Sequence, residues 1–223
     1  MVYDIETVGV EFTELDDLQK EYFLQWSESE EDEERVKSQT AFYALTGKVV
    51  TVAMINPDSG RGRVYGVGEH TEVHEDDTEF FFVPDEKTLL THFWSDVEEY
   101  HQFITFNGRG FDAPYLLLRS AVNRVKPSID IMGYRYKSVP HLDLADQFTF
   151  FGATRKKFPL HFYCKAFGIE SPKEDGMTGL DVPRYFKEGR VKEIAEYCLR
   201  DVEATTELLE YWDEYLSPDV MGR

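Results

Sequence analysis

The stretch Val2-Tyr3-Asp4-Ile5-Glu6-Thr7 combines the pattern of a buried strand with two acidic side chains. Apolar residues flank both acids, and residues two apart on a strand face the same side, so Asp4 and Glu6 are expected to project together from one face of a sheet. Neighbouring carboxylates raise each other's pKa, and burial adds to that cost. A divalent cation removes the repulsion, so the pair predicts a metal site. The alternative is a solvated strand end, where each acid faces water.

A helical stretch near the other end of the chain carries a matching pair. Tyr197 and Asp201 are four residues apart in Glu196-Tyr-Cys-Leu-Arg-Asp-Val-Glu203, which places the phenol and the carboxylate on one helix face. Oxygen ligands without Cys or His favour Mg²⁺ or Mn²⁺ over Zn²⁺. The alternative for Asp201 is a surface position facing water.

A third segment, Phe103-Ile-Thr-Phe-Asn-Gly-Arg-Gly-Phe-Asp-Ala-Pro-Tyr115, predicts a short strand, a turn and a helix that opens at or near Asp112. Pro114 is tolerated in a first helical turn, which supports this start. Asp112 is then expected at the carboxyl end of a strand beside the first one, where open α/β sheets bind ligands. Three separate elements can therefore bring four acids to one pocket: Asp4, Glu6, Asp112 and Asp201.

In this order the segments resemble the DEDD superfamily of 3′-5′ exonucleases, whose motifs are DxE on a strand, Asp after a turn, and YxxxD or HxxxxD on a helix. Glu196 and not His stands five residues before Asp201, so the chain resembles the tyrosine (DEDDy) subclass. It is also similar to the proofreading domains of family B DNA polymerases and, most closely, to stand-alone PolB-like predicted 3′-5′ exonucleases. Residues that carry this further similarity are Asn107, Phe111-Asp112, Pro114-Tyr115 and the stretches 44–50, 141–144 and 189–195.

The resemblance implies hydrolysis of a terminal phosphodiester with two divalent cations, Mg²⁺ or Mn²⁺. In that scheme Asp4 bridges both ions, Glu6 and Asp201 complete the tighter site, and Asp112 holds the second ion through water. Tyr197 orients the attacking water, because an unperturbed phenol has a pKa of about 10 and is a poor base.

The resemblance also implies three substrate contacts. Asn107 and Phe111 are expected to position the terminal nucleotides, and the backbone of Thr7 is expected to lie against the 3′ end. The alternatives are core packing at a helix start for Phe111 and simple turn formation for Asn107.

Hydrophobic periodicity predicts one α/β domain over residues 1–223. Three early strands followed by alternating helices and strands resemble the ribonuclease H-like order, which implies a mixed five-stranded sheet flanked by helices on both sides. An acidic helical insertion is expected at about 9–45. The segment around His70 and His74 and the stretch 172–179 are predicted loops. The expected strands are 2–6, 49–55, 63–67, 103–106 and 141–144, and the expected helices are 86–100, 112–123, 160–167 and 191–216.

Composition supports a globular protein of 223 residues. Apolar runs stay well short of the roughly 20 residues that cross a bilayer, and no charged and apolar leader opens the sequence, so an intracellular, cytoplasmic protein that does not bind membranes is expected. Cys164 and Cys198 are expected to be buried thiols that do not form a disulfide.

Net charge opposes nucleic-acid binding at first sight, because the chain carries −19 and phosphates are repelled by acids. The distribution softens this objection. Residues 1–100 carry 7 basic and 25 acidic side chains, whereas residues 101–157 carry 9 basic and 4 acidic ones, a local excess of +5. The acidic runs at 28–34 and 72–79 are expected to be solvated helix faces or loops, the alternative being a partner-binding surface.

Taken together, the sequence predicts a metal-dependent 3′-5′ exonuclease that releases nucleoside monophosphates from single-stranded DNA ends. The alternatives are a 3′-5′ exoribonuclease, since the same chemistry handles RNA, and a catalytically inactive nucleic-acid-binding module. A polymerase or a DNA repair factor acting in trans is the expected protein partner.

Overall fold

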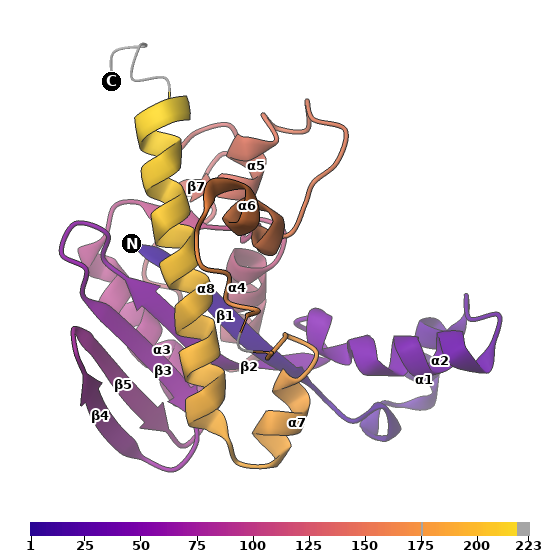
Figure 1. Cartoon of the computed structure of the whole chain (residues 1–223). Helices are drawn as coiled ribbons and strands as arrows, with labels where there is room; N and C mark the ends of the chain where they lie inside the picture. The colour runs from indigo at the N-terminus through magenta and orange to yellow at the C-terminus, as the bar shows by residue number, and fades with distance from the viewer. Residues whose placement is uncertain (175, 218–223) are drawn as a thin grey trace.

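A seven-stranded mixed sheet forms the centre of the computed structural model, which describes residues 1–174 and 176–217 (Figure 1). β1 runs antiparallel to β2 and parallel to β6, so the sheet is mixed as expected. The strands lie in the spatial order β4 (Thr71–Glu75), β5 (Thr78–Val83), β3 (Gly62–Val67), β2 (Gly47–Ile55), β1 (Val2–Gly9), β6 (Phe103–Thr105) and β7 (His141–Asp143).

The prediction of five strands is wrong, because β4 lies in the stretch interpreted as an acidic loop and β5 begins at the end of that stretch. β4 is an edge strand whose side chains are exposed or half-buried on both faces, so its sequence lacks the alternation that marks a strand. His74 lies on β4, within 3.0 Å of the carboxylate of Glu72. The apolar run Phe80-Phe-Phe-Val83 in β5 was a signal for this strand.

Helices cover both faces of the sheet, as predicted. The long helix α8 (Val191–Tyr211) crosses one face, with α5 (Leu144–Phe148) and α6 (Leu160–Phe167) beside it (Figure 1). The other face packs against α3 (Glu86–Asp96) and α4 (Asp112–Val122). Shorter turns complete the chain: η3 (Val97–Glu99), α7 (Val182–Lys187) and the π-helical turn Trp212–Leu216.

Four short helices separate β1 from β2, in the region predicted as the helical insertion. α1 and α2 project sideways from the body of the molecule (Figure 1), and none of their residues is buried. The last helix returns and docks on the end of β1. Bounds are η1 (Phe12–Glu14), α1 (Asp17–Leu24), α2 (Glu30–Lys37) and η2 (Ser38–Phe42).

Two hydroxyl groups fasten η2 to β1. The Oγ1 of Thr7 donates to the carbonyl of Ala41 at 2.9 Å, and the Oγ1 of Thr40 donates to the carbonyl of Val10 at 3.0 Å. The backbones approach closely at Gly9, where a Cβ would lie 2.0 Å from the Oγ1 of Thr40 and 2.6 Å from the backbone nitrogen of Ala41. Only a residue without a side chain fits there.

Both cysteines are buried free thiols, which confirms the prediction for Cys164 and Cys198. Within the described ranges, no helix is both long enough and apolar enough to span a bilayer. The predicted loop at 172–179 contains no helix or strand at its described positions, and Asp175 lies outside them.

Gly9→Ala should destabilise the protein by about 1 to 3 kcal/mol, because the new methyl group forces two backbones apart. Gly179→Ala is the matched control, since a Cβ there meets no atom within 4 Å. Chemical denaturation of both variants checks this, and equal stabilities would contradict the close packing at Gly9.

Candidate active site

Three carboxylates converge between β1 and α8. Asp4, Glu6 and Asp201 each offer an oxygen, and these oxygens all lie within 4.8 Å of one another. Asp4 and Glu6 share a face of β1 as their spacing predicted, and that face is the one that α8 covers. The sheet register shifts just beyond Glu6, where the pairing skips Val50 of β2. Such irregularities commonly lie beside active sites, where they re-aim side chains.

Asp112 reaches the same site from the opposite helical layer. β6 ends at Thr105 and pairs with β1 only near Val2, which leaves the next part of β1 open on that side. The carboxylate of Asp112, at the first residue of α4, fills the opening and accepts a hydrogen bond from the backbone N–H of Ile5 at 3.1 Å. The structure therefore brings all four predicted acids together.

Burial and the proximity of the carboxylates raise the pKa values of the four acids. Burial raises the pKa of Asp4 and of Glu6 well above the usual range, and the neighbouring carboxylates raise both further. Burial also raises the pKa of Asp112 to about 7 and that of Asp201 to about 6. Without a counter-charge the four groups resist full ionisation near neutral pH, which is the electrostatic character of a cation site.

Two further side chains of α8 touch the acids. Burial, and then the charge of Asp201, raises the pKa of the Tyr197 phenol, so the phenol stays protonated. The thiol of Cys198 lies 3.5 Å from the carbonyl oxygen of Asp4 and 3.7 Å from its Oδ2. Cys198 is three residues before Asp201, so the two side chains share a helix face.

A pocket of about 760 Å³ opens over the acids. Thr7, Asn107 and Phe111, the predicted substrate contacts, all line it. The ring of Phe111 also packs 5.2 Å from that of Tyr115, so it contributes to the core and to the pocket. Residues of η2 and of the region around α7 close the far side: Thr40, Ala41, Phe42, Leu180, Pro183 and Arg184.

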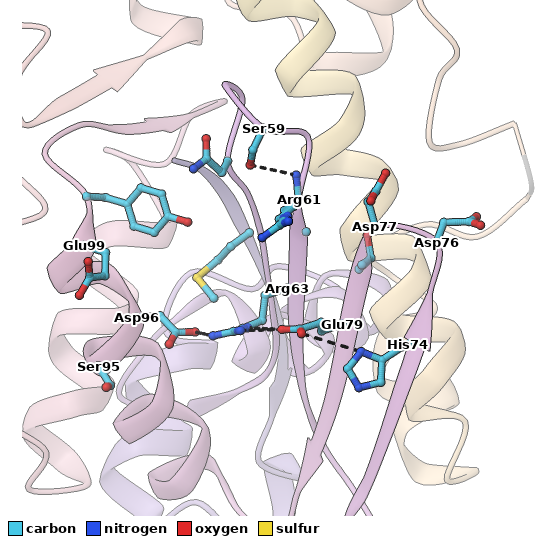
Figure 2. Close-up of a pocket in the computed structure, with 15 residues that line it drawn as sticks. Ser59, Arg61, Arg63, His74, Asp76, Asp77, Glu79, Ser95, Asp96 and Glu99 are labelled. Atoms are coloured by element: carbon cyan, nitrogen blue, oxygen red, sulfur yellow. Dashed lines mark hydrogen bonds and ion pairs between the residues drawn. The ribbon is translucent and has the colours of Figure 1, made fainter.

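A second polar cavity, of about 780 Å³, lies at the far edge of the sheet (Figure 2). Arg63 lies at its centre, bonded to Glu79 at 2.5 Å and to Asp96 at 3.0 Å. Figure 2 shows His74 beside Glu79 on the neighbouring strands. In this cavity Arg63 supplies a counter-charge to Glu79 and Asp96, whereas the acids of the first pocket raise one another's pKa, so the first pocket is the candidate active site.

A sequence model of one protein family matches residues 42–211, which is most of the chain. Its description reads predicted 3′-5′ exonuclease related to the exonuclease domain of PolB. The chain belongs to this family. It is therefore a member of a family of predicted 3′-5′ exonucleases. The match contains Asp112, Tyr197 and Asp201, and β1, with Asp4 and Glu6, lies before it.

A solved structure supports the fold of the exonuclease. The family B DNA polymerase from the hyperthermophilic archaeon Pyrobaculum calidifontis matches with a TM-score of 0.59 and 19% sequence identity. The alignment covers 95% of this chain and 24% of the polymerase chain, so the exonuclease corresponds to about a quarter of that protein. No curated protein matches the sequence. The ribonuclease H-like fold predicted from the sequence is confirmed.

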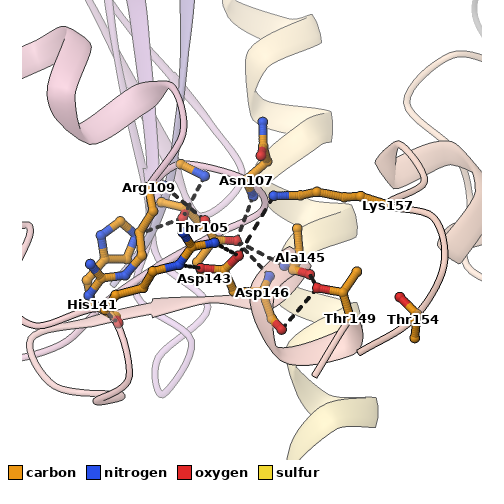
Figure 3. Close-up of polar contacts among 12 residues, drawn as sticks. Thr105, Asn107, Arg109, His141, Asp143, Ala145, Asp146, Thr149, Thr154 and Lys157 are labelled. Carbon is orange, nitrogen blue, oxygen red and sulfur yellow. Dashed lines mark hydrogen bonds and ion pairs between the residues drawn. The ribbon is translucent and has the colours of Figure 1, made fainter. Parts of the chain in front are cut away.

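The turn that carries Asn107 into the exonuclease pocket is held by Asp143, at the end of β7 (Figure 3). One carboxylate oxygen accepts the backbone N–H of Asn107 at 2.9 Å, and the other accepts that of Arg109 at 2.9 Å. The same side chain caps α5 by accepting the N–H groups of Ala145 and Asp146. Asn107 has φ 69°, a left-handed conformation that these bonds help to hold.

Sequence reasoning missed Asp143 because its partners are backbone groups far away in sequence. The stretch His141-Leu-Asp-Leu144 was interpreted as a strand alone. An acid at the end of a short strand and just before a helix start was the available signal, since such acids cap helices.

The acids of the exonuclease fit divalent cations. Each of Asp4, Glu6 and Asp201 offers an oxygen at mutual distances that one ion can span. The donors are carboxylates, which suit Mg²⁺ or Mn²⁺. Their raised pKa values show that the folded protein lacks enough positive charge of its own at this point.

In EDTA, the free energy of unfolding should fall as the pH rises from about 4 to about 8. An unfolded aspartate titrates at 3.8, whereas Asp201 and Asp112 titrate at about 6 and about 7 in the folded protein. The folded state therefore holds more protons in this window, and raising the pH favours unfolding by about 1.4 kcal/mol per unit of pKa shift. Thermal unfolding across the pH range measures this.

Excess Mn²⁺ should remove most of that loss, because cations bind the ionised carboxylates. Asp201→Asn is the control, since it deletes one titrating group and should flatten the pH dependence in EDTA. An unchanged slope in Asp201→Asn would show that the acids of the pocket are not its cause.

Asp143→Ala should lower the stability by about 3 kcal/mol and reduce nuclease activity more than tenfold, because several backbone N–H groups lose a charged acceptor. Asp130→Ala is the matched control. Asp130 also accepts two backbone N–H groups, those of Met132 and Gly133, but it lies in an exposed loop. Denaturation and nucleotide release separate the two effects, and similar behaviour of both variants would contradict the positioning role.

Proposed function

We propose that this exonuclease releases nucleoside monophosphates from the 3′ ends of single-stranded DNA with the help of two divalent cations. The observation that carries the proposal is the meeting of four carboxylates from β1, α4 and α8 in one pocket. Support for DNA comes from the family, which is related to the exonuclease domain of a DNA polymerase.

The proposed cation ligands are the four acids. Asp4 is central, because, beyond burial, the charges of Asp112, Asp201 and Glu6 all raise the pKa of its carboxyl group. We therefore assign Asp4 to both ions. Glu6 and Asp201 complete one site, and Asp112 serves the second. When bound, the cations supply an activated water and neutralise charge on the phosphate and on the leaving 3′ oxygen.

Tyr197 is assigned to orient the attacking water. Its hydroxyl shares a helix face with Asp201 and keeps its proton, because burial raises the phenol pKa. A protonated phenol can donate or accept a hydrogen bond but cannot remove a proton at neutral pH. The side chain therefore positions a water molecule without acting as a base.

Three residues of the pocket wall are assigned to the terminal nucleotides. Phe111 offers a half-buried ring face on which a base can stack, and Asn107 offers an exposed amide. Thr7 is assigned a contact through its backbone, because its hydroxyl already donates a hydrogen bond to the carbonyl of Ala41. A paired duplex end would have to fray before its last nucleotide could reach the acids, so a single strand is the favoured substrate.

Asp4→Ala and Asp201→Ala should each lower kcat by about 10³-fold or more, whereas Tyr197→Phe should retain activity reduced by roughly 10²-fold. The reason is that the acids hold the cations and the phenol only orients water. Glu207→Ala, an exposed acid on the same helix, is the control and should leave kcat unchanged. Mononucleotide release from a labelled oligonucleotide in Mg²⁺ or Mn²⁺ provides the measurement. Complete loss in Tyr197→Phe would instead make the phenol essential to the chemistry.

Matched DNA and RNA oligonucleotides test the substrate assignment. The proposal expects faster release of nucleotides from DNA, and release should begin at the 3′ end when either end is blocked in turn. Faster decay of RNA would replace the DNA assignment with the exoribonuclease alternative. Binding without any release by the wild-type protein would favour the inactive binding module.

A further inference from the structure

Four aromatic rings lie on the surface beside the active-site turn. Tyr134 and Tyr136 are 65% and 62% exposed, and Phe150 and Phe151 are 55% and 38% exposed. The ring centroids of Tyr134 and Tyr136 are 5.6 Å apart, and those of Tyr136 and Phe151 are 5.1 Å apart. We call these four residues the aromatic platform. Its members come from two loops, which meet where the ring of Tyr136 packs against that of Phe151.

The backbone under the platform is turned in a way that large side chains rarely adopt. Phe150 and Phe151 have φ values of 49° and 54°, consecutive left-handed conformations. The amide N–H of Phe150 donates to the carbonyl of Gln147 at 2.8 Å, and that of Phe151 donates to the carbonyl of Asp146 at 2.7 Å. These hydrogen bonds hold the two strained residues in place, yet both rings remain exposed to solvent. Burial of the rings is therefore not what the strained backbone achieves.

The two loops that carry the platform are rich in basic residues, on an otherwise acidic protein. The stretch 134–157 holds five basic residues and two acidic ones. Both acids are engaged within the fold, since Asp143 holds backbone N–H groups and Asp146 pairs with Arg135 at 2.7 Å. Lys157 lies 4.0 Å from Asp146 (Figure 3). The exposed basic residues of the two loops are Arg135, Lys137, Arg155, Lys156 and Lys157.

The platform is joined directly to the active-site pocket. The guanidinium of Arg109 donates to the carbonyls of Gly133 at 3.4 Å and Tyr134 at 3.2 Å. Arg109 belongs to the turn that Asp143 anchors, and the same turn presents Asn107 to the pocket. From the other loop, the chain runs through Lys157 to Leu160, which also lines the pocket. Both loops of the platform are therefore connected to residues of the pocket wall.

We infer that the aromatic platform binds the single-stranded nucleic acid that extends from the active site, on the 5′ side of the terminal nucleotides. Exposed rings stack on unpaired bases of any sequence, and the neighbouring lysine and arginine side chains follow the phosphates. A duplex buries its base faces and cannot use the rings. The inference rests on the proposed function for the direction of the strand.

Binding of a fluorescent thymidine oligonucleotide of about 12 nucleotides, a length within the range of single-strand sites, tests the platform. Anisotropy in EDTA excludes hydrolysis. Tyr136→Ala and Phe151→Ala should each raise the Kd at least about fivefold, the lower end of what one lost base stack costs. Tyr22→Ala is the matched control, because Tyr22 is 71% exposed but lies on the acidic insertion. Tyr136→Phe keeps a ring and should restore binding.

Equal Kd values for wild type, Tyr136→Ala and Phe151→Ala would overturn the inference, as would an equal loss in Tyr22→Ala. The absence of measurable binding by the wild-type protein would also overturn it. Thermal unfolding of each variant identifies any loss caused by misfolding, and Tyr136→Phe then provides the folded comparison.

Kinetics separate the platform from the chemistry. The p-nitrophenyl ester of thymidine 5′-monophosphate has a single phosphodiester and reaches only the pocket, so its hydrolysis should be unchanged in Tyr136→Ala and Phe151→Ala. The KM for the oligonucleotide should rise in both variants. If the wild type binds the oligonucleotide but never releases nucleotides with Mg²⁺ or Mn²⁺, the proposed function fails and the platform stands. If both variants instead show the wild-type KM for the oligonucleotide, the platform inference fails and the proposed function stands.

Discussion

Mutual repulsion among four carboxylates is the constraint on which the arrangement of this exonuclease depends. Asp4, Glu6, Asp112 and Asp201 lie at one partly or fully buried point, and burial together with proximity raises their pKa values. A folded chain keeps such a cluster only where the remaining contacts are strong enough to hold it. Hard cations relieve the same repulsion, so the feature that costs stability without metal is also the one that suits the site to bind cations.

Contacts around the cluster use backbone groups as much as side chains. Asp112 is fixed by the N–H of Ile5, which is available because β6 is short. Asp143 holds the neighbouring turn through backbone N–H groups, and the carbonyl of Ala41 accepts from Thr7. Each contact joins segments that are distant along the chain. The geometry of the pocket consequently depends on contacts along the whole edge of the sheet, including contacts of residues that do not line the pocket.

Much of the fold and of the acid cluster could be predicted from the sequence, and the exceptions have physical causes. Strands and helices with one apolar face were recognised, because burial imposes a period on their sequences. β4 was missed since it is an edge strand whose residues are mostly exposed. Asp143 and Cys198 were missed because their contacts are tertiary, although the three-residue spacing between Cys198 and Asp201 was a usable signal.

By itself, the sequence determined that Asp4 and Glu6 share a strand face and that Tyr197 and Asp201 share a helix face, because the periods of strands and helices are local properties of the backbone. Only the tertiary structure decided that these faces meet, that Asp112 crosses from the other layer, and that the rings of Tyr136 and Phe151 lie together beside the pocket. Those outcomes depend on strand order, register and loop paths, which are set by long-range packing and not by any local period.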